Sequence, residues 1–422
     1  MAALIPILRP CRLALALLLA SLLGACGTAS SNKAEPEALR GTTFVMIGTR
    51  GHTEISRAVQ EEQGRLLDLL DADFQTLHPE TQLQVDLFRE ASLPAVVADR
   101  SRDGLGPDLI LVGSGIARSL MDAGLSRPVP LTAELRRLIP AHLLAQVVRG
   151  ADQLVGIPVL LEPQLACFDR RRLAQSPSSL SALEALDERG IEVGLPIDAF
   201  DLYWTVGAYG AHSAMARLTR GAPLSAADQQ TLLRWLRWLR TVNLRERVNF
   251  FNSQEDLLQG LLAGRLDWIS CRSTHFERLQ RVLGPRFGVA LLPSGPGGPA
   301  TPLIRQRVWV FGRDSSPGQR RLAEDFVRFS LTPTMQRFLT LHTRSMLPVS
   351  REVEPPSGGS PVLRAMVASE QQSWVREAIG PELRGDDPRL ERQRRLFLSL
   401  IYSELSPEQV LQKLMLLRGR GR

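Results

Sequence analysis

The chain has 422 residues, a formal net charge of +7 at pH 7 and an apolar fraction of 44%. This length exceeds what one ordinary hydrophobic core supports, so two lobes are expected. A basic chain can bind nucleic acid, but here the positive charge is almost all arginine scattered along the sequence, since Lys33 and Lys413 are its only lysines. The composition therefore favours a two-lobed globular protein and argues against a nucleic-acid-binding one.

The first 26 residues have the order of a processing signal. Two arginines precede an apolar run over residues 13–23, which is shorter than the about 20 residues of a membrane-spanning helix and typical of a signal-peptide core. Leu23-Gly24-Ala25-Cys26 then resembles the bacterial lipobox, the alternative being an ordinary signal peptide with a chance cysteine. We expect residues 1–25 to be a lipoprotein signal peptide, Cys26 to carry the lipid and residues 26–41 to be a tether. The mature protein would lie in the periplasm or at the cell exterior, anchored to the membrane.

Two further cysteines, Cys167 and Cys271, each lie within an apolar, strand-like run. The expected compartment is oxidising, so a disulfide between them is possible. Free cysteine is commonly buried, however, and two buried free thiols are the expectation.

Strands and helices alternate in the first part of the chain. This alternation predicts an α/β lobe with a parallel sheet, in which ligands bind at the carboxyl ends of the strands. Two loops at such ends are residues 48–52 and 113–115. The predicted elements are a strand at 43–48, a helix at 55–76, a strand at 83–87, a helix at 94–102, a strand at 107–112 and a helix ending near Gly124.

Residues 156–169 read as two short apolar strands joined by a polar centre. Pro158 and Pro163 suit strand starts or edges, and Glu162 and Gln164 lie between the apolar halves. A carboxylate in such a place needs a buried partner, or else water and a ligand. Both interpretations, a buried strand with a satisfied glutamate and a ligand-binding glutamate, stay open at this point.

The second part of the chain is again mixed. Trp235 and Trp238 belong to a long predicted helix and are expected in the core. Predicted helices cover 181–190, 200–209, 226–242, 254–264 and 320–331, with further helices after Pro333 and from Val362 onward. A short segment at 193–198 leads into the helix at 200–209, and predicted strands cover 265–271, 287–293 and 308–311, the last returning the chain to the first lobe.

Several segments together resemble the maltose-binding-protein-like extracellular solute-binding proteins, the receptors of ABC importers. The crossing at 156–169, L-L-A-G-R-L-D-W-I-S at 261–270, F-G-V-A-L-L-P-S-G-P-G-G at 287–298 and L-P-V-S at 347–350 follow the family's order. The resemblance implies a two-lobed periplasmic-binding-protein type II fold with a hinge and C-terminal helices. Its implied lobes are 42–158 plus 303–343 (N-lobe) and 159–302 plus 344–422 (C-lobe).

The same resemblance implies the function and the partners. The protein would be the substrate-binding component of an ABC importer, capturing a sugar or sugar-like compatible solute between its lobes and delivering it to the membrane permease. It would be a monomer without enzymatic activity, cofactor or metal. Carried over residue by residue, the resemblance implies a ligand site formed by Thr49, Arg50, Ser114, Glu162, Asp198, Phe200, Arg272, Ser273, Thr274, Arg305, Gln306 and Trp374.

The sequence departs from the family pattern at two places in this site. Arg272-Ser273-Thr274 stands where the family often has a stacking tryptophan, and residues 304–307 stand where it often has glycines. Aromatic stacking is therefore expected to be weak, which makes a small or partly anionic ligand more plausible. Arg307 is expected to be a solvated surface charge, and His52 and His275 are expected to be surface histidines.

Three other functions remain open from the sequence. One is a receptor for an anionic polyol such as a glycerol phosphodiester. Another is a lipoprotein glycosidase that uses Asp198 and Glu162 as its carboxylate pair. The sequence lacks the G-x-S-x-G, H-E-x-x-H and P-loop motifs of other enzyme classes. The third is a lipoprotein that presents its solute to a sensor rather than to an importer.

Overall fold

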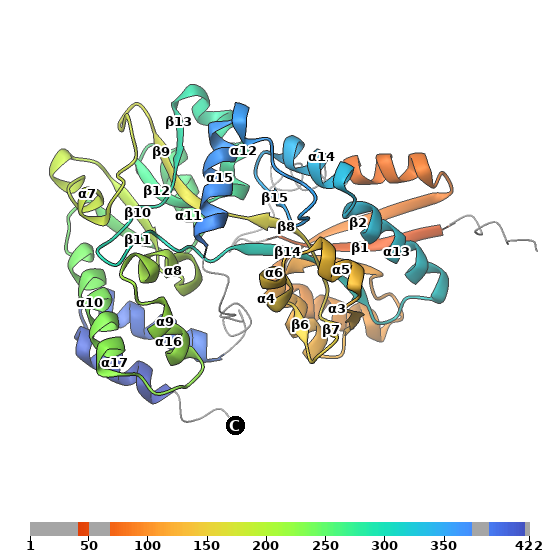
Figure 1. Cartoon of the computed structure of the whole chain (residues 1–422), viewed down its shortest axis with the longest axis horizontal. Coiled ribbons are helices and arrows are strands. Elements are labelled where there is room, and N and C mark those ends of the chain that lie inside the picture. Colours follow the sequence, from red (N-terminus) through yellow and green to blue (C-terminus); the bar gives the residue numbers. More distant parts are fainter. Residues whose placement is uncertain (1–40, 50–67, 374–387, 418–422) are drawn as a thin grey trace, which may run out of the picture. The chain divides into compact units, whose positions relative to one another are not determined.

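The computed structural model describes residues 41–49, 68–373 and 388–417, and its β-strands form two main sheets and one small sheet (Figure 1). The predicted lipidation residue Cys26, the predicted tether and His52 lie outside these ranges. So does most of the helix predicted at 55–76, of which residues 68–77 are described and helical.

The first sheet is mixed rather than parallel throughout. Its strand order is β15-β8-β14-β3-β1-β2, with β4 beside β14. Strands β1 to β3 are parallel, as expected, but β14 runs antiparallel to β3 and β8. The chain leaves this sheet at the end of β8 and re-enters at the start of β14, so these strands must run in opposite directions. The bounds are β1 (Gly41–Thr49), β2 (Thr81–Arg89), β3 (Leu109–Gly113), β4 (Ser126–Arg127), β8 (Ile157–Glu162), β14 (Arg305–Gly312) and β15 (Leu347–Pro348).

The second sheet has the order β11-β10-β12-β9-β13. Strand β10 is parallel to β11 and β12, and β9 is antiparallel to β12 and β13. A small third sheet, unexpected from sequence, has the order β5-β7-β6. The bounds are β9 (Gln164–Asp169), β10 (Val193–Pro196), β11 (Val248–Phe251), β12 (Trp268–Arg272), β13 (Phe287–Ala290), β5 (Val129–Pro130), β6 (Val148–Arg149) and β7 (Gln153–Leu154).

Serine and threonine caps set where many of the helices begin. Helix α13 starts before its predicted position at Arg320, because Ser316 and Gln319 form a capping box with Pro317 in the first turn. The bounds are α3 (Leu93–Arg102), α4 (Ser114–Asp122), α5 (Ala133–Leu138), α6 (Ala141–Ala145), α7 (Leu180–Glu184), α8 (Ala199–Ala208), α9 (His212–Thr219), α10 (Ala226–Asn243), α11 (Gln254–Leu262), α12 (Phe276–Leu283), α13 (Pro317–Ser330), α14 (Pro333–Thr343), α15 (Pro361–Gln372), α16 (Pro388–Ile401) and α17 (Pro407–Leu416). Short 3-10 turns cover Glu90–Ser92, Asp187–Arg189, Ser273–His275, Gly284–Arg286 and Ser357–Gly359.

The second sheet carries a tryptophan-rich core against α8, α10, α16 and α17, which pack on one another. Trp235 and Trp238 are buried there, as predicted. Each satisfies its indole N–H, Trp235 by donating to Thr205 Oγ1 at 2.8 Å and Trp238 by donating to Glu184 Oε1 at 2.8 Å. The C-terminal helix α15 packs on β9 and β13, so it also belongs with the second sheet.

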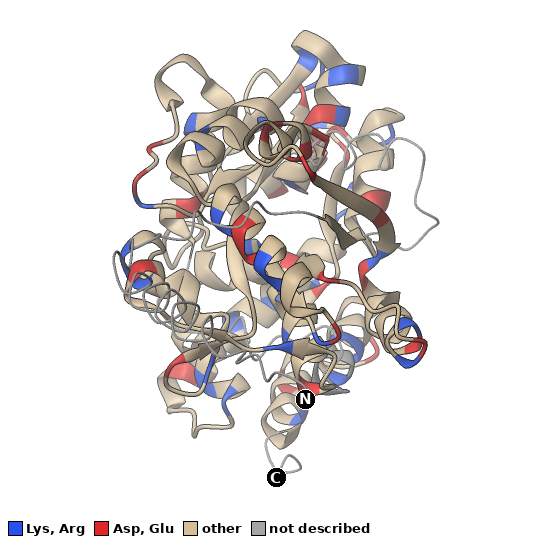
Figure 2. Cartoon of the chain, turned by 90° about the vertical axis from the view of Figure 1, so that its right-hand side faces the viewer, with Lys and Arg blue, Asp and Glu red and all other residues tan. Residues whose placement is uncertain are grey.

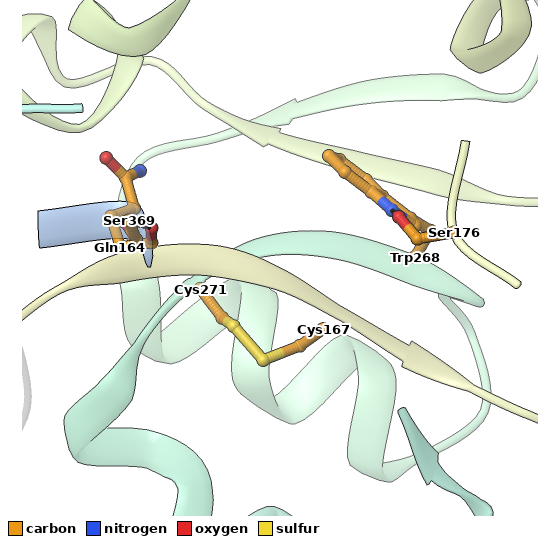
Figure 3. Close-up of a disulfide and its surroundings, with 6 residues drawn as sticks. All are labelled: Gln164, Cys167, Ser176, Trp268, Cys271 and Ser369. Atoms are coloured by element: carbon orange, nitrogen blue, oxygen red, sulfur yellow. Dashed lines mark hydrogen bonds between the residues drawn. A yellow bond between two sulfur atoms is a disulfide. The ribbon is translucent and has the colours of Figure 1, made fainter. Parts of the chain in front are cut away.

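Cys167 and Cys271 form a disulfide, so the expectation of two free thiols is wrong (Figure 3). Cys167 in β9 lies opposite Ile269 in β12, and Cys271 is two residues further along the same strand. Because side chains alternate between faces, the two cysteines share one face as diagonal neighbours, with Cα atoms 5.8 Å apart. The register of the two strands, which the sequence does not reveal, makes this pairing possible.

Basic and acidic residues are interspersed in the view of Figure 2, in keeping with the scattered arginines of the sequence. Among the described residues, no helix has the length and apolarity needed to span a membrane.

Candidate functional site

The chain passes from the first sheet to the second at Pro163. Glu162 is the last residue of β8 and Gln164 is the first of β9, and both are buried. Across the two ladders, Glu162 lies opposite Arg305 and Gln164 lies opposite Arg272. The predicted crossing is therefore confirmed, and two predicted site residues flank it on neighbouring strands.

Strand directions bring the ends of both sheets to this crossing. Strand β8 is parallel to β1 and β3, because each of β8 and β3 is antiparallel to β14. Thr49, the last residue of β1, and Ser114, which follows β3, therefore lie at the edge where β8 ends. Strand β9 starts where β12 ends at Arg272, and β10 ends on the same side, just before Asp198. Carboxyl ends of parallel strands are where α/β sheets bind ligands.

Asp201, in the first turn of α8, accepts hydrogen bonds from two of the arginines predicted for the site, Arg272 and Arg305. Its Oδ1 accepts hydrogen bonds from Arg272 Nε at 2.8 Å, from Arg272 Nη2 and from Arg305 Nη2 at 2.8 Å. Arg272 also donates from Nη1 to the carbonyl oxygen of Leu303 at 3.1 Å. The Asp201 and Arg272 side chains are 5% and 4% exposed, so this is a buried ion pair, whereas Arg305 keeps 19% of its side-chain surface.

Asp198 caps the same helix and is the accessible acid of the group. Its Oδ1 accepts the backbone N–H groups of Phe200 at 3.0 Å and Asp201 at 3.2 Å, and lies 3.9 Å from Arg305 Nη2. The side chain is 48% exposed, yet desolvation by the surrounding protein, followed by the charge of Asp201, raises its pKa.

Phe200 offers its ring to the arginines. The guanidinium carbon of Arg305 lies 4.6 Å from the ring centroid and that of Arg272 lies 5.2 Å from it, both within cation–π range. Contact with two guanidinium groups leaves less of this half-buried ring for stacking on a sugar.

A second buried network occupies the carboxyl end of the first sheet. Arg307, expected on the surface, is 5% exposed, and that expectation is wrong. Its Nη2 donates to the carbonyl oxygens of Gly48 in β1 at 2.9 Å and of Leu111 in β3 at 3.0 Å. Its Nε lies 3.9 Å from Glu162 Oε1, and its Nη1 lies 4.0 Å from Glu90 Oε1. Side chains alternate along β14, so Arg305 and Arg307 share a face.

Gln306 points to the opposite face of β14 and away from these arginines. Its Nε2 donates to the carbonyl oxygen of Leu143 at 3.2 Å and to Gln146 Oε1 at 3.0 Å, at helix α6. The structure therefore does not bring it together with the other predicted site residues. Its role in ligand binding stays a prediction.

The remaining predicted residues lie around the crossing or outside the described chain. Thr49 donates its hydroxyl to the carbonyl oxygen of Phe88 at 3.0 Å, and Ser114 begins α4 half-buried. Ser273 is buried and donates its backbone N–H to the carbonyl oxygen of Pro163 at 3.0 Å, with Thr274 half-buried beside it. Arg50 and Trp374 lie outside the described residues.

His275 is partly buried rather than on the surface, which corrects its expected position. Burial lowers its pKa to about 4, although the nearby Glu255 carboxylate acts in the opposite direction. Among the described residues, no group of three or more histidine, cysteine, aspartate or glutamate side chains is placed to hold a metal ion.

Residues 95–362 match the family of bacterial extracellular solute-binding proteins. The chain belongs to this family. Among curated proteins, none matches the sequence.

Solved solute-binding proteins share the fold at low sequence identity. The GacH receptor of Streptomyces glaucescens, solved without ligand and with acarbose, aligns with a TM-score of 0.70 at 14% identity, over 91% of this chain and 100% of its own. The maltodextrin-binding protein of L. casei gives 0.67 at 15%, over 90% and 98%. The maltose/maltodextrin-binding domain of Bdellovibrio bacteriovorus, bound to maltotriose, gives 0.66 at 13%, over 90% and 98%. These likenesses confirm the predicted two-lobed α/β fold.

Within this solute-binding protein, sequence reasoning missed Asp201 and Glu90. Asp201 stands three residues after Asp198, and acids in a first helical turn are ordinarily interpreted as favourable partners of the helix dipole. That pattern hides its contacts with two arginines. Glu90 accepts the backbone N–H of Gly113, at the start of α4, and no sequence signal marks this contact.

Proposed function

We propose that the protein is the substrate-binding component of an ABC importer that captures an uncharged sugar or sugar-like solute at the crossing. The observation that supports this function most is the convergence of both sheets' carboxyl ends on residues 162–164, beside the N-terminus of α8. Asp198, Phe200 and Arg305 would contact the solute, because they are the less buried members of the group. Glu162, at the polar centre, would accept a ligand hydroxyl.

The charge of the group favours an uncharged ligand over an anionic polyol. The two networks hold the carboxylates of Glu90, Glu162, Asp198 and Asp201 against the guanidinium groups of three arginines. Four negative and three positive charges give the described group a formal net charge of −1, which would repel an anionic ligand. The acarbose and maltotriose complexes of the structural neighbours are consistent with a sugar-type solute.

A thermal-shift screen of sugars, polyols, glycosylglycerols and glycerol phosphates tests this proposal. A ligand that binds only the folded state stabilises it, and the unfolding temperature rises. At a free ligand concentration of one hundred times Kd, the gain in stability is about 2.7 kcal/mol. A neutral glycan or polyol should give the largest shift. A shift with glycerol phosphates alone would contradict an uncharged ligand, and turnover of glycosides would contradict a binding protein.

Capture would involve closure of the two lobes about the crossing, and the solute drives closure only by preferring the closed state. Small-angle scattering at saturating ligand should then give a smaller radius of gyration, and an unchanged radius would count against closure.

We further propose that the mature protein is a monomer anchored through the lipid on Cys26, and that the ABC permease is its partner. Detergent partitioning of Cys26→Ser tests the anchor, which fails if that variant stays membrane-bound after its signal is removed. Co-purification of the permease subunits with the ligand-loaded protein tests the importer against a sensor role.

A further inference from the structure

Asp201 is the point at which the positive charge of the site converges. Its side chain is 5% exposed, and a single oxygen, Oδ1, accepts from Arg272 and from Arg305. Arg272 ends β12 of the second sheet, and Arg305 begins β14 of the first. One carboxylate on α8 therefore holds the guanidinium groups of residues that come from both sheets.

This arrangement has the chemistry of an occupied anion site. Two arginines that converge on one oxygen, with further donors in the same planes, are what proteins use to bind phosphate or carboxylate groups. Arg305 Nε is buried and has no hydrogen-bond acceptor among the described residues. The Arg305 side chain is also 19% exposed, so it is the arginine of the pair that a solute could reach.

The charge balance depends on Asp201. Arg272 and Arg305 carry two positive charges, which Asp201 and the nearby Asp198 offset. Without the carboxylate at position 201 this group would carry a net charge of +1. Both arginines would then retain donors aimed at the place that Oδ1 occupies.

We propose that Asp201 is a built-in anion that fills the fork of Arg272 and Arg305, and so makes the site reject anionic solutes and accept uncharged ones. This inference deepens the proposed function and rests on it for the identity of the site. Asp201 is thus a specificity-determining residue, which acts by holding two arginines rather than by contacting the solute.

Asp201→Asn tests the inference, because asparagine removes the charge and leaves only a neutral amide oxygen, a weaker acceptor that phosphate can displace from the two arginines. The probe is inorganic phosphate, titrated by calorimetry against chloride at matched ionic strength, since salt screens weak binding. We expect the wild-type protein to bind phosphate no better than chloride, and Asp201→Asn to bind phosphate at least about tenfold more tightly than wild type does, the effect of a hydrogen bond to a charged group. A folded Asp201→Asn protein without this gain would overturn the inference.

Asp198→Asn is the matched control. It removes one negative charge from the same helical turn, keeps an oxygen able to cap α8, and leaves the Asp201 fork filled. If this control gains phosphate affinity to the same extent as Asp201→Asn, net charge alone explains the gain and the specific role of Asp201 is refuted.

If Asp201→Asn does not fold in chloride, phosphate should restore its unfolding transition by replacing the missing carboxylate. The double variant Asp201→Asn with Arg272→Gln, which removes one charge of each sign, should fold without phosphate. If the double variant folds but phosphate does not restore folding of the single variant, the inference is refuted. Because these experiments use no sugar, a negative sugar screen would contradict the proposed function without deciding the role of Asp201.

Discussion

Removal of the Cys167–Cys271 disulfide is expected to destabilise the second lobe. The bridge joins β9 to β12, and both cysteines are fully buried. Cys167→Ala combined with Cys271→Ala deletes the crosslink without introducing a buried hydroxyl group. It also leaves the hydrogen bonds of the two strands in place, because those are made by the backbone.

The magnitude follows from the length of chain that the bridge closes. Its cysteines are 104 residues apart, and closing a loop of about 100 residues in the unfolded chain gives about 4.7 kcal/mol of stabilisation in the chain-entropy description. Measured losses on removing native disulfides are about 2–5 kcal/mol. Each single alanine variant removes the whole crosslink, so it should lose nearly as much stability as the double variant.

Denaturant unfolding followed by tryptophan fluorescence measures this loss, because Trp268 precedes Cys271 by three residues in β12. If the lobes unfold separately, only the transition that reports the second lobe should move. Wild-type protein in reductant is the control, since it keeps both side chains and loses only the bond. A double variant within about 1 kcal/mol of oxidised wild type would refute the reasoning, as would a reduced wild type that stays as stable as the oxidised protein.

Two further predictions concern the site. Glu162→Gln should weaken binding of the ligand found in the screen by about 1.5–3 kcal/mol, or roughly 10- to 150-fold in Kd by calorimetry, because charge-assisted hydrogen bonds are lost. The control Glu277→Gln, on the surface of α12, should leave binding unchanged. If Glu162→Gln binds within about twofold of wild type but melts at a lower temperature, Glu162 has a structural role instead. His275, with its pKa lowered to about 4 in the folded protein, binds fewer protons than in the unfolded chain. Because the unfolded chain takes up the proton first, the contribution of His275 to the free energy of unfolding should be at its full value above pH ~6.5 and fall by about 2 kcal/mol between pH 7 and pH 5. A fall of the same size in His275→Gln would contradict this.

The sequence predicted most of the fold, because hydrophobic periodicity and loop residues are local signals. The strand–helix alternation anticipated β1 to β3, the two apolar halves of residues 156–169 anticipated β8 and β9, and the apolar run at 308–311 anticipated β14. The direction of β14 and the pairing of β15 with β8 depend on contacts distant in sequence, so the expected parallel sheet turned out mixed. The short strands β4 to β7 carry no periodicity long enough to be recognised.

The site was harder to predict, because burial and ionic partners are tertiary properties. Asp198, Phe200, Arg272 and Arg305 do come together, as the family pattern implied. Arg307 was expected in solvent because nothing in its neighbourhood along the chain offers it a partner. Two of its partners, the carbonyl oxygens of Gly48 and Leu111, come from residues more than 190 positions away in the chain, and only the folded sheet brings them near.

The residues that connect the two lobes also belong to the candidate site, so a substitution there can affect both stability and binding. Glu162 and Gln164 sit on either side of Pro163, opposite Arg305 and Arg272 in their ladders. A buried ion pair adds little net stability when formed, but losing one partner strands the other charge at a large cost. A change at Arg272 can therefore weaken binding by disturbing α8 and the crossing, without any contact to the solute. Binding losses at these positions identify ligand contacts only where the unfolding free energy of the same variant is unchanged.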